Sequence, residues 1–248
     1  MKIALITDIH ANREAFEACM EQAHLHGAQR VAFLGDFVGY GADPAWVLDR
    51  VMELVATSGA IAVRGNHDHA TAIGARPGMV EDAAKVINWT RSQLTPDQLR
   101  FLEELPLVRE DGECLFAHAN AYAPSEWGYI LARADAVRSM MATQARYTFC
   151  GHVHEPQLYN LAGTGKIGDF TPTAGVAIPV PPHRQWLILP GSAGQPRDGN
   201  PAACWALFDT ERHTLTFHRV PYNYEVTGAK ILAAGLPPRL AHRLSEGT

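Results

Sequence analysis

Short apolar runs that end in polar residues recur in the first part of the chain. Three such runs occupy residues 3–6, 31–34 and 61–63. After the first run, one helical face is formed by Ala15, Phe16, Cys19 and Ala23. Residues 44–55 also have helical spacing, and they follow Asp43, a residue type that caps helices. This alternation predicts parallel strand–helix–strand units with right-handed crossovers.

Further along the chain, helices and strands separate into blocks. Residues 70–105 are mostly helical, with a helix start at 95–97 and an end at 105–106. Strands are then expected at 107–109, 114–117, 147–150, 157–161, 186–189, 203–208 and 214–220. Two more helical stretches are expected, near 132–144 and over 224–244 with an interruption at 235–238, and residues 162–185 are expected to form an irregular hairpin or loop. Without a repeat or a linker, the pattern predicts one α/β domain over residues 1–248, built from two sheets with helices outside.

Composition removes several classes of protein. The chain has 248 residues, of which 47% are hydrophobic and 19% charged, which excludes disorder, collagen-like repeats and coiled coils. The four cysteines are widely spaced and form no Cys-x-x-Cys pair, so free buried thiols in a reducing compartment are expected. A net charge of −5 argues against binding of a nucleic-acid backbone by charge, although a small nucleotide remains a possible substrate. We expect a cytoplasmic protein because no secretory leader and no membrane span is recognised.

Polar residues of types that can bind metal ions follow five of the expected strands. In chain order they are Asp8, His10, Asp36, Asn66, His67, Asp68, His118, His152 and His154. Each has an ordinary explanation by itself, because an Asp after a strand is usually a turn or cap residue and a lone His is usually structural. Burying so many unpaired ions would cost several kcal/mol each. Ligands bind beyond the carboxyl ends of α/β strands, so a shared metal site explains all five together.

The types of ligand narrow the choice of metal ion. A mixture of carboxylate, amide and imidazole without thiolate favours Mn, Fe, Zn, Ni or Co over calcium or a structural cysteine-rich zinc site. The ligands are too many for one tetrahedral ion, but they suit two ions that share one carboxylate and leave room for solvent.

At this point the motifs resemble a known family. They are Asp-x-His at 8–10, Gly-Asp-x-x-Gly at 35–39, Gly-Asn-His-Asp at 65–68, His-Ala at 118–119 and Gly-His-x-His at 151–154. In this order they resemble the calcineurin-like metallophosphoesterases, and residues 190–198 resemble a loop of the bacterial phosphodiesterase-like branch. The resemblance implies a four-layer αββα sandwich of two mixed sheets flanked by helices.

The resemblance also implies the ligands of two divalent transition-metal ions, with manganese as the first choice. One ion would be held by Asp8, His10, Asp36 and His154. The other would be held by Asp36, Asn66, His118 and His152, which makes Asp36 the bridge. A hydroxide between the ions would attack the phosphate.

Two further residues of the motifs are expected to be catalytic. The resemblance places His67 beside the metals and close to the leaving group of the phosphate, where it would donate a proton or a hydrogen bond. Asp68 would hydrogen-bond His67 and fix the orientation of its ring.

The sequence departs from some relatives in the second motif. Phosphoprotein phosphatases and symmetrical diadenosine-tetraphosphatases of this superfamily carry an Arg where this chain has Tyr40, which weakens that assignment. Arg197 is the candidate substitute, and Asn12 and Tyr40 are further candidates for substrate contact. Residues 70–100 form either a lid over the site or, as we favour, an ordinary packing helix.

The sequence therefore predicts a dinuclear metal-dependent phosphoesterase that acts on a small phosphorylated substrate of nucleotide type, such as a dinucleoside polyphosphate or a phosphodiester. Alternatives are a phosphoprotein phosphatase and a catalytically silent metal-binding scaffold of the same fold. A β-lactamase-like metallohydrolase is disfavoured because the His-x-His-x-Asp-His run of that fold is missing. Monoester, diester or anhydride preference, the native metal and the oligomeric state stay open.

Overall fold

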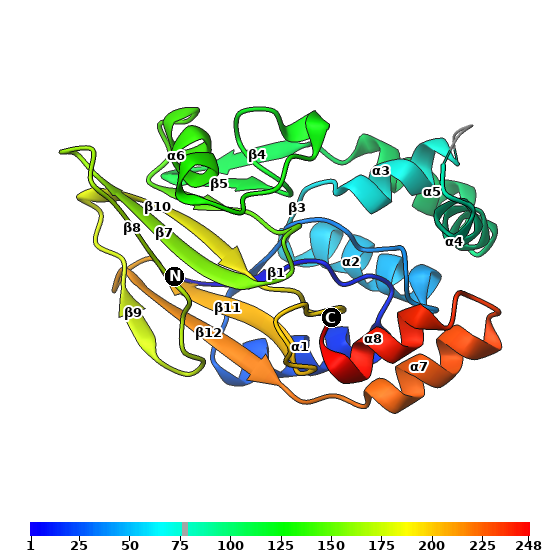
Figure 1. Cartoon of the computed structure of the whole chain (residues 1–248). Helices are drawn as coiled ribbons and strands as arrows, with labels where there is room; N and C mark the ends of the chain where they lie inside the picture. Colours follow the sequence, from blue (N-terminus) through cyan, green and yellow to red (C-terminus); the bar gives the residue numbers. More distant parts are fainter. Residues whose placement is uncertain (76–78) are drawn as a thin grey trace.

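Two six-stranded mixed sheets form the centre of the computed structural model, which describes residues 1–75 and 79–248 (Figure 1). The first sheet has the strand order β3 (Ile61–Ala62), β2 (Arg30–Phe33), β1 (Lys2–Ile6), β11 (Ala203–Asp209), β12 (Thr214–Val220) and β9 (Ala177–Pro179). The second has the order β4 (Val108–Asp111), β5 (Cys114–Ala117), β6 (Tyr147–Phe149), β10 (Arg184–Pro190), β7 (Pro156–Ala162) and β8 (Ile167–Phe170). As predicted, β1, β2 and β3 are parallel to one another.

Helices cover the outer face of each sheet, which confirms the expected four layers. The helices are α1 (Arg13–Leu25), α2 (Pro44–Ser58), α3 (Asn66–Ile73), α4 (Glu81–Ser92), α5 (Pro96–Glu104), α6 (Arg133–Met141), α7 (Tyr224–Ala233) and α8 (Arg239–Glu246), with a short 3-10 turn at Pro124–Glu126. Residues of α1 and α2 pack against the first sheet, and residues of α6 pack against the second. Helices α3, α4, α7 and α8 gather at one end of the sheets (Figure 1).

The alternation of side chains along β1 explains how one short strand serves two layers. Ile3 and Leu5 point between the two sheets, where they join the aromatic core around Phe116 and Phe149. Ala4 and Ile6 point to the opposite face and pack in the cluster that includes α1 and α2. β1 is thus apolar on both faces. The apolar run ends at the first polar residues after the strand, where the loop that carries Asp8 and His10 begins.

Two sequence expectations need correction. Residues 162–185 are more ordered than a loop, because they contain β8 and also β9, which pairs with β12 at the edge of the first sheet. Asp43 precedes α2 as expected, but its side chain does not cap the helix. Asp43 Oδ2 instead accepts a hydrogen bond from Lys230 Nζ at 2.8 Å, because α7 lies close enough to supply a cation.

The segment 70–100 packs as helices, apart from residues 76–78, which lie outside the described residues. Val86 of α4 belongs to a buried cluster with residues of the α7–α8 hairpin such as Ile231 and Leu240. Arg91 Nη1 donates to the backbone carbonyls of Thr71 and Ala72, which ties α4 to α3. Within the described ranges, 1–75 and 79–248, no helix is both long and apolar enough to cross a bilayer.

Candidate metal centre

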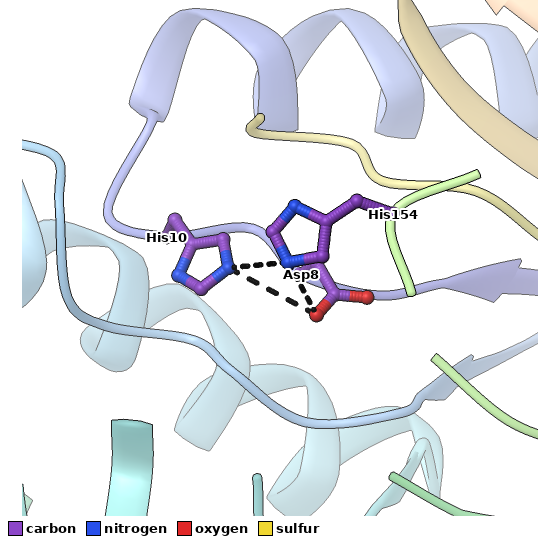
Figure 2. A group of neighbouring side chains, drawn as sticks. All are labelled: Asp8, His10 and His154. Carbon is purple, nitrogen blue, oxygen red and sulfur yellow. Dashed lines mark hydrogen bonds and ion pairs between the residues drawn. The ribbon is translucent and has the colours of Figure 1, made fainter. Parts of the chain in front are cut away.

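The loops that follow the strands bring the predicted ligands into two adjoining groups. Asp8, His10 and His154 form one group, and Asp36, His118 and His152 form the other, with the ligand atoms of each group within 4.8 Å of one another. In the first group, His154 Nε2 lies 3.2 Å from Asp8 Oδ1 and 3.1 Å from His10 Nε2. Figure 2 shows these three side chains converging from two separate segments of the chain. All six side chains are buried.

Asp36 connects the two groups, and Asn66 joins the second one. Asp36 Oδ2 lies 3.4 Å from His118 Nε2 and 3.8 Å from His10 Nε2, so one carboxylate oxygen faces both groups. Asn66 Oδ1 lies 3.0 Å from His118 Nε2, and His118 Nε2 lies 3.1 Å from His152 Nδ1. The structure therefore brings all seven predicted ligands together, and it gives Asp36 the place between them that a bridging residue needs.

The back of each imidazole ring faces a backbone carbonyl. His10 Nδ1 donates to Val38 O and His118 Nδ1 to Leu34 O. His154 Nδ1 donates to Gln195 O at 2.6 Å, and His152 Nε2 donates to Trp127 O at 2.9 Å. A nitrogen this close to a carbonyl oxygen carries the proton, so in each neutral ring the lone pair is on the nitrogen that faces the centre. Four lone pairs that converge with carboxylate oxygens fit a cation.

At several positions of this site the backbone is in a left-handed conformation, which residues other than glycine rarely adopt. Within the described residues, nine residues other than glycine have a positive φ, and five of them are predicted ligands: Asp8, His10, Asp36, His152 and His154. Such a conformation costs of the order of 1–3 kcal/mol per residue. Concentrated strain of this kind is typical of functional sites, where surrounding structure holds side chains in a required direction.

Two glycines permit the close approach of these loops. A Cβ at Gly65 would lie 2.0 Å from Asp36 Oδ1, and a Cβ at Gly151 would lie 2.0 Å from Thr7 Oγ1 and 2.7 Å from Asp8 Oδ2. Each glycine directly precedes a predicted ligand, Asn66 or His152. Because a Cβ at either position would overlap these atoms, any side chain there would push Asp36 or Asp8 out of the centre.

Burial and neighbouring charges oppose each other in the electrostatics of the centre. Burial alone would raise the pKa of Asp36, but the charges of His118 and His67 hold that pKa well below its usual range. Burial would lower the pKa of His118, but the charge and hydrogen bond of Asp36 and the charge of Asp8 together outweigh burial and raise the pKa to about 9. Burial, followed by the charge of His118, lowers the pKa of His152 to about 4. In the metal-free protein a proton on His118 therefore supplies part of the positive charge that a metal ion would bring to the centre.

The expected hydrogen bond from Asp68 to His67 is not found. Asp68 Oδ2 accepts from the backbone N–H groups of Asp36 and Gly65 at 2.8 and 2.9 Å. Asp68 Oδ1 accepts from the N–H of Phe37 at 2.9 Å and of Val38 at 3.3 Å. Burial and the charge of Asp36 raise the pKa of Asp68 to about 7. Asp68 thus fixes the loop that carries Asp36 instead of the His67 ring, because backbone donors saturate its carboxylate.

His67 lies beside the predicted ligands, and one of its ring nitrogens is within 4.8 Å of ligand atoms of His10 and Asp36. Its ring centroid is 5.0 Å from that of His10 and 4.4 Å from that of Tyr40, and its backbone N–H donates to Asp36 Oδ1 at 2.8 Å. The ring packs so closely on Gly39 that a Cβ there would lie 2.6 Å from His67 Nδ1. Burial lowers the pKa of His67. Unlike the predicted ligands His118 and His152, which are buried, His67 is only partly buried.

Asn12 has a structural role in place of the expected substrate contact. Its Oδ1 caps α1 by accepting from the Ala15 N–H, and it also accepts from the Thr227 hydroxyl. Its Nδ2 donates to Gly194 O and to Tyr222 Oη. The side chain is buried and its hydrogen-bonding capacity is used, so it joins α1 to α7 and to the 190–198 loop.

Tyr40 and Arg197, the other predicted substrate-contact residues, lie close to each other and to the predicted ligand His10. The Tyr40 ring centroid is 4.5 Å from that of His10. Burial raises the pKa of Tyr40, while the nearby Arg197 guanidinium acts in the opposite direction. Arg197 Nη2 donates to Gln195 Oε1 at 3.1 Å, and its buried Nε has no hydrogen-bond partner among the described residues. The Arg197 guanidinium therefore lies beside Tyr40, close to the centre.

Two aromatic residues at the centre, Trp127 and Tyr129, were not predicted from the sequence. Tyr129 stacks on the His152 ring with 4.0 Å between centroids and 12° between planes. Trp127 supplies the carbonyl that orients His152, and its ring lies edge-on to His118 at 6.1 Å. Both belong to an irregular segment before α6, and a backbone carbonyl carries no signature in the residue type, so periodicity and motifs could not reveal them.

Comparison with known proteins finds relatives that match nearly the whole chain. Residues 1–213 match the family model of the calcineurin-like phosphoesterase superfamily domain. An uncharacterized protein of Methanocaldococcus jannaschii is 32% identical over 251 residues, covering 99% of this chain and 98% of that protein. The solved structure of a metallophosphoesterase from Sphaerobacter thermophilus is 33% identical, with a TM-score of 0.88 over 100% of this chain and 99% of that one. A hypothetical protein from Pyrococcus horikoshii OT3 shares the fold at 20% identity, with a TM-score of 0.80 over 100% of this chain and 98% of that one.

Proposed function

Because the chain belongs to the calcineurin-like phosphoesterase superfamily, we propose that it is a hydrolase of phosphate esters or phosphoanhydrides that depends on two divalent metal ions. The observation that carries the proposal is the position of Asp36 Oδ2 between two groups of ligand atoms, 3.8 Å from His10 Nε2 and 3.4 Å from His118 Nε2. One carboxylate that faces two histidine-rich groups suits a pair of ions better than a single ion.

The seven ligands Asp8, His10, Asp36, Asn66, His118, His152 and His154 would hold the ions. When bound, two divalent ions offset the charge of phosphate oxygens and make water a nucleophile at neutral pH. The set contains imidazole, carboxylate and amide but no thiolate, and the four cysteines are all buried. Manganese is our first choice, and iron, zinc, nickel and cobalt suit the same ligands.

The chain's own residues would handle the leaving group and the phosphate charge. Water attacks phosphorus, the bond from phosphorus to the leaving oxygen breaks, and the electron pair stays on that oxygen. His67, partly buried at the edge of the centre, would donate a proton or a hydrogen bond to this oxygen, a contribution typically worth about 10²–10⁴ in rate. Arg197, whose guanidinium lies beside Tyr40, would bind a phosphate oxygen, and Tyr40 would border the same phosphate.

We place a small phosphorylated molecule of nucleotide type first among substrates, such as a dinucleoside polyphosphate or a phosphodiester. The net charge of −5 favours small substrates over a polyanionic backbone. A phosphoprotein is less suited, because Tyr40 stands where phosphoprotein phosphatases carry a phosphate-binding Arg.

The test is an assay of metal-stripped protein with added Mn²⁺ against a substrate panel. The panel contains p-nitrophenyl phosphate, bis-p-nitrophenyl phosphate, diadenosine tetraphosphate, a cyclic nucleotide and a phosphopeptide. We expect metal-dependent turnover of at least one small ester or anhydride, and the preferred compound defines the subclass. Preference for the phosphopeptide would indicate a phosphoprotein phosphatase. Two bound ions without any turnover would indicate a metal-binding scaffold.

A further inference from the structure

A cavity of about 240 Å³ adjoins the metal centre on the side of His67. Its inner end is formed by Tyr40, Asn66 and His67, so it opens directly onto residues of the centre. Its other walls come from α4 and α8, two helices that lie far apart in the sequence and gather at the same end of the sheets (Figure 1). The cavity is therefore placed where a group attached to the reacting phosphate would extend past His67.

The helical walls of this cavity are mainly apolar. Ala83 and Val86 of α4 face Leu240 of α8 across it. Val86 and Leu240 are only 6% and 3% exposed and belong to the buried cluster that joins the two helices, so their positions are fixed by packing. Fixed apolar walls favour an apolar group that leaves water when it binds.

The charges at the cavity add a second constraint. Arg239 lines it and pairs with Asp82, with 3.2 Å between Nη2 and Oδ2. Arg243 also lines it, and among the described residues no ion pair is seen for its guanidinium. One positive charge therefore remains in excess at the cavity. This charge opposes the binding of a cationic group but not of a neutral or anionic one.

The size of the cavity excludes large occupants. Sites for drug-sized ligands have volumes of about 300–1,000 Å³, so 240 Å³ suits a single ring but not a peptide segment. The wall from α8, Arg239–Glu246, also lies beyond residues 1–213, the part that matches the superfamily model. This wall is thus a feature of the chain outside the matched domain, as a specificity element would be.

We infer that this cavity binds one uncharged or anionic aromatic ring of the leaving group, such as a phenyl ring or a nucleobase, and thereby places the leaving oxygen beside His67. The inference rests on the proposed function, which it extends to the substrate class. Ala83, Val86 and Leu240 are then specificity-determining residues, and His67 is the point where the cavity meets the chemistry.

The test compares a substrate with a ring and one without. Phenyl phosphate carries a ring in its leaving group, whereas acetyl phosphate has a small leaving group that leaves the cavity empty. Ala83→Trp fills the cavity from α4, and Asn88→Trp adds the same side chain at an exposed position of the same helix. For Ala83→Trp we expect kcat/KM to fall about 10-fold or more with phenyl phosphate and to stay within about twofold with acetyl phosphate. Asn88→Trp is expected to change neither.

A binding measurement separates this inference from the proposed function. Ligand-observed NMR with phenol and the metal-free protein should detect binding to the wild type and to Asn88→Trp, but not to Ala83→Trp. Phenol binding without turnover of either phosphate compound would support the cavity and contradict the proposed function. Absence of phenol binding to the wild type, or an equal loss of both activities in a folded Ala83→Trp protein, would overturn the cavity assignment. If thermal melting shows that Ala83→Trp is unfolded, Ala83→Leu must give the same selective loss, smaller in size, or the assignment is wrong.

Discussion

His10 Nε2 and His154 Nε2 face each other at 3.1 Å (Figure 2). The proton of each neutral ring is on the opposite nitrogen, Nδ1, where it is held in a hydrogen bond to the backbone. His10 Nδ1 donates to Val38 O, and His154 Nδ1 donates to Gln195 O. In the neutral rings two lone pairs therefore oppose each other in a buried site, which is unfavourable without a positive charge between them. This relationship is the most direct sign in the fold that a cation belongs at the centre.

Asp36→Asn should lower the occupancy of both metal positions. The substitution removes the negative charge of the oxygen that faces His10 and His118, and an amide bridges two cations poorly. Metal analysis after dialysis should find less than one ion per chain and a loss of turnover. Asp97→Asn is the matched control, because the Asp97 side chain is 78% exposed and lies in α5, outside the centre. Two retained ions with normal turnover in Asp36→Asn would show that Asp36 is not the bridge.

His67→Ala should retain the metal ions and slow the reaction. The His67 side chain adjoins the ligands, but it is assigned to the leaving oxygen, so kcat should fall about 10²-fold or more. The loss should be larger for a poor leaving group than for p-nitrophenolate, which needs no proton. Measurement of kcat across a series of leaving groups checks this, and unchanged turnover of the poorest one would remove His67 from the mechanism.

Asp68→Asn should destabilise the protein instead of acting on the His67 ring. The amide keeps one acceptor oxygen, so two of the four backbone N–H groups that Asp68 binds lose their partner. Unsatisfied buried donors cost about 1–3 kcal/mol each, which predicts a loss of about 2–6 kcal/mol in the free energy of unfolding. Urea denaturation of the metal-free protein measures it. A variant of normal stability with reduced kcat alone would instead favour orientation of His67 by Asp68.

Metal binding should become tighter as the pH rises towards 9. In the metal-free protein Asp36 raises the pKa of His118 to about 9 against the effect of burial, so a metal ion must displace a proton below that pH. The expected gain is about tenfold in affinity per pH unit for one released proton. The same raised pKa stabilises the metal-free fold fully below the ordinary histidine pKa, and this contribution is lost as the pH rises through 9.

Titration calorimetry at pH 7.5 in two buffers of different ionisation enthalpy counts the released protons. About one proton should be released when the metal ion held by His118 binds. A pH-independent affinity between pH 7 and 8.5, with no proton released, would contradict the protonation of His118 in the metal-free protein.

The ligands could be predicted from the sequence because each one interrupts an apolar strand at its end. Asp8 and Asp36 follow runs whose burial is nearly complete, and polar residues at such positions need a common partner. The sequence pattern predicts two sheets with helices outside, and the four layers are expected from the resemblance of the motifs to a known family. Because β1 is apolar on both faces, only the packing in the structure shows that Ile3 and Ala4 face different layers.

The roles of Asn12 and Asp68 depend on partners that the local sequence does not reveal. Asn12 binds Thr227, which is 215 residues away, and Asp68 binds backbone N–H groups that any residue type supplies. The carbonyl of Trp127 behind His152 and the α8 wall of the cavity near His67 arise in the same way. These features come from packing between distant segments, so they need the structure.

The central claim is that two metal ions share Asp36 in a catalytic centre, and metal content measured together with turnover tests it most directly. Metal-stripped protein would be titrated with Mn²⁺ while bound metal per chain and hydrolysis of bis-p-nitrophenyl phosphate or p-nitrophenyl phosphate are followed in the same samples. The account predicts about two ions per chain and activity that appears as the second position fills. Full activity with a single bound ion, or with none, would contradict it.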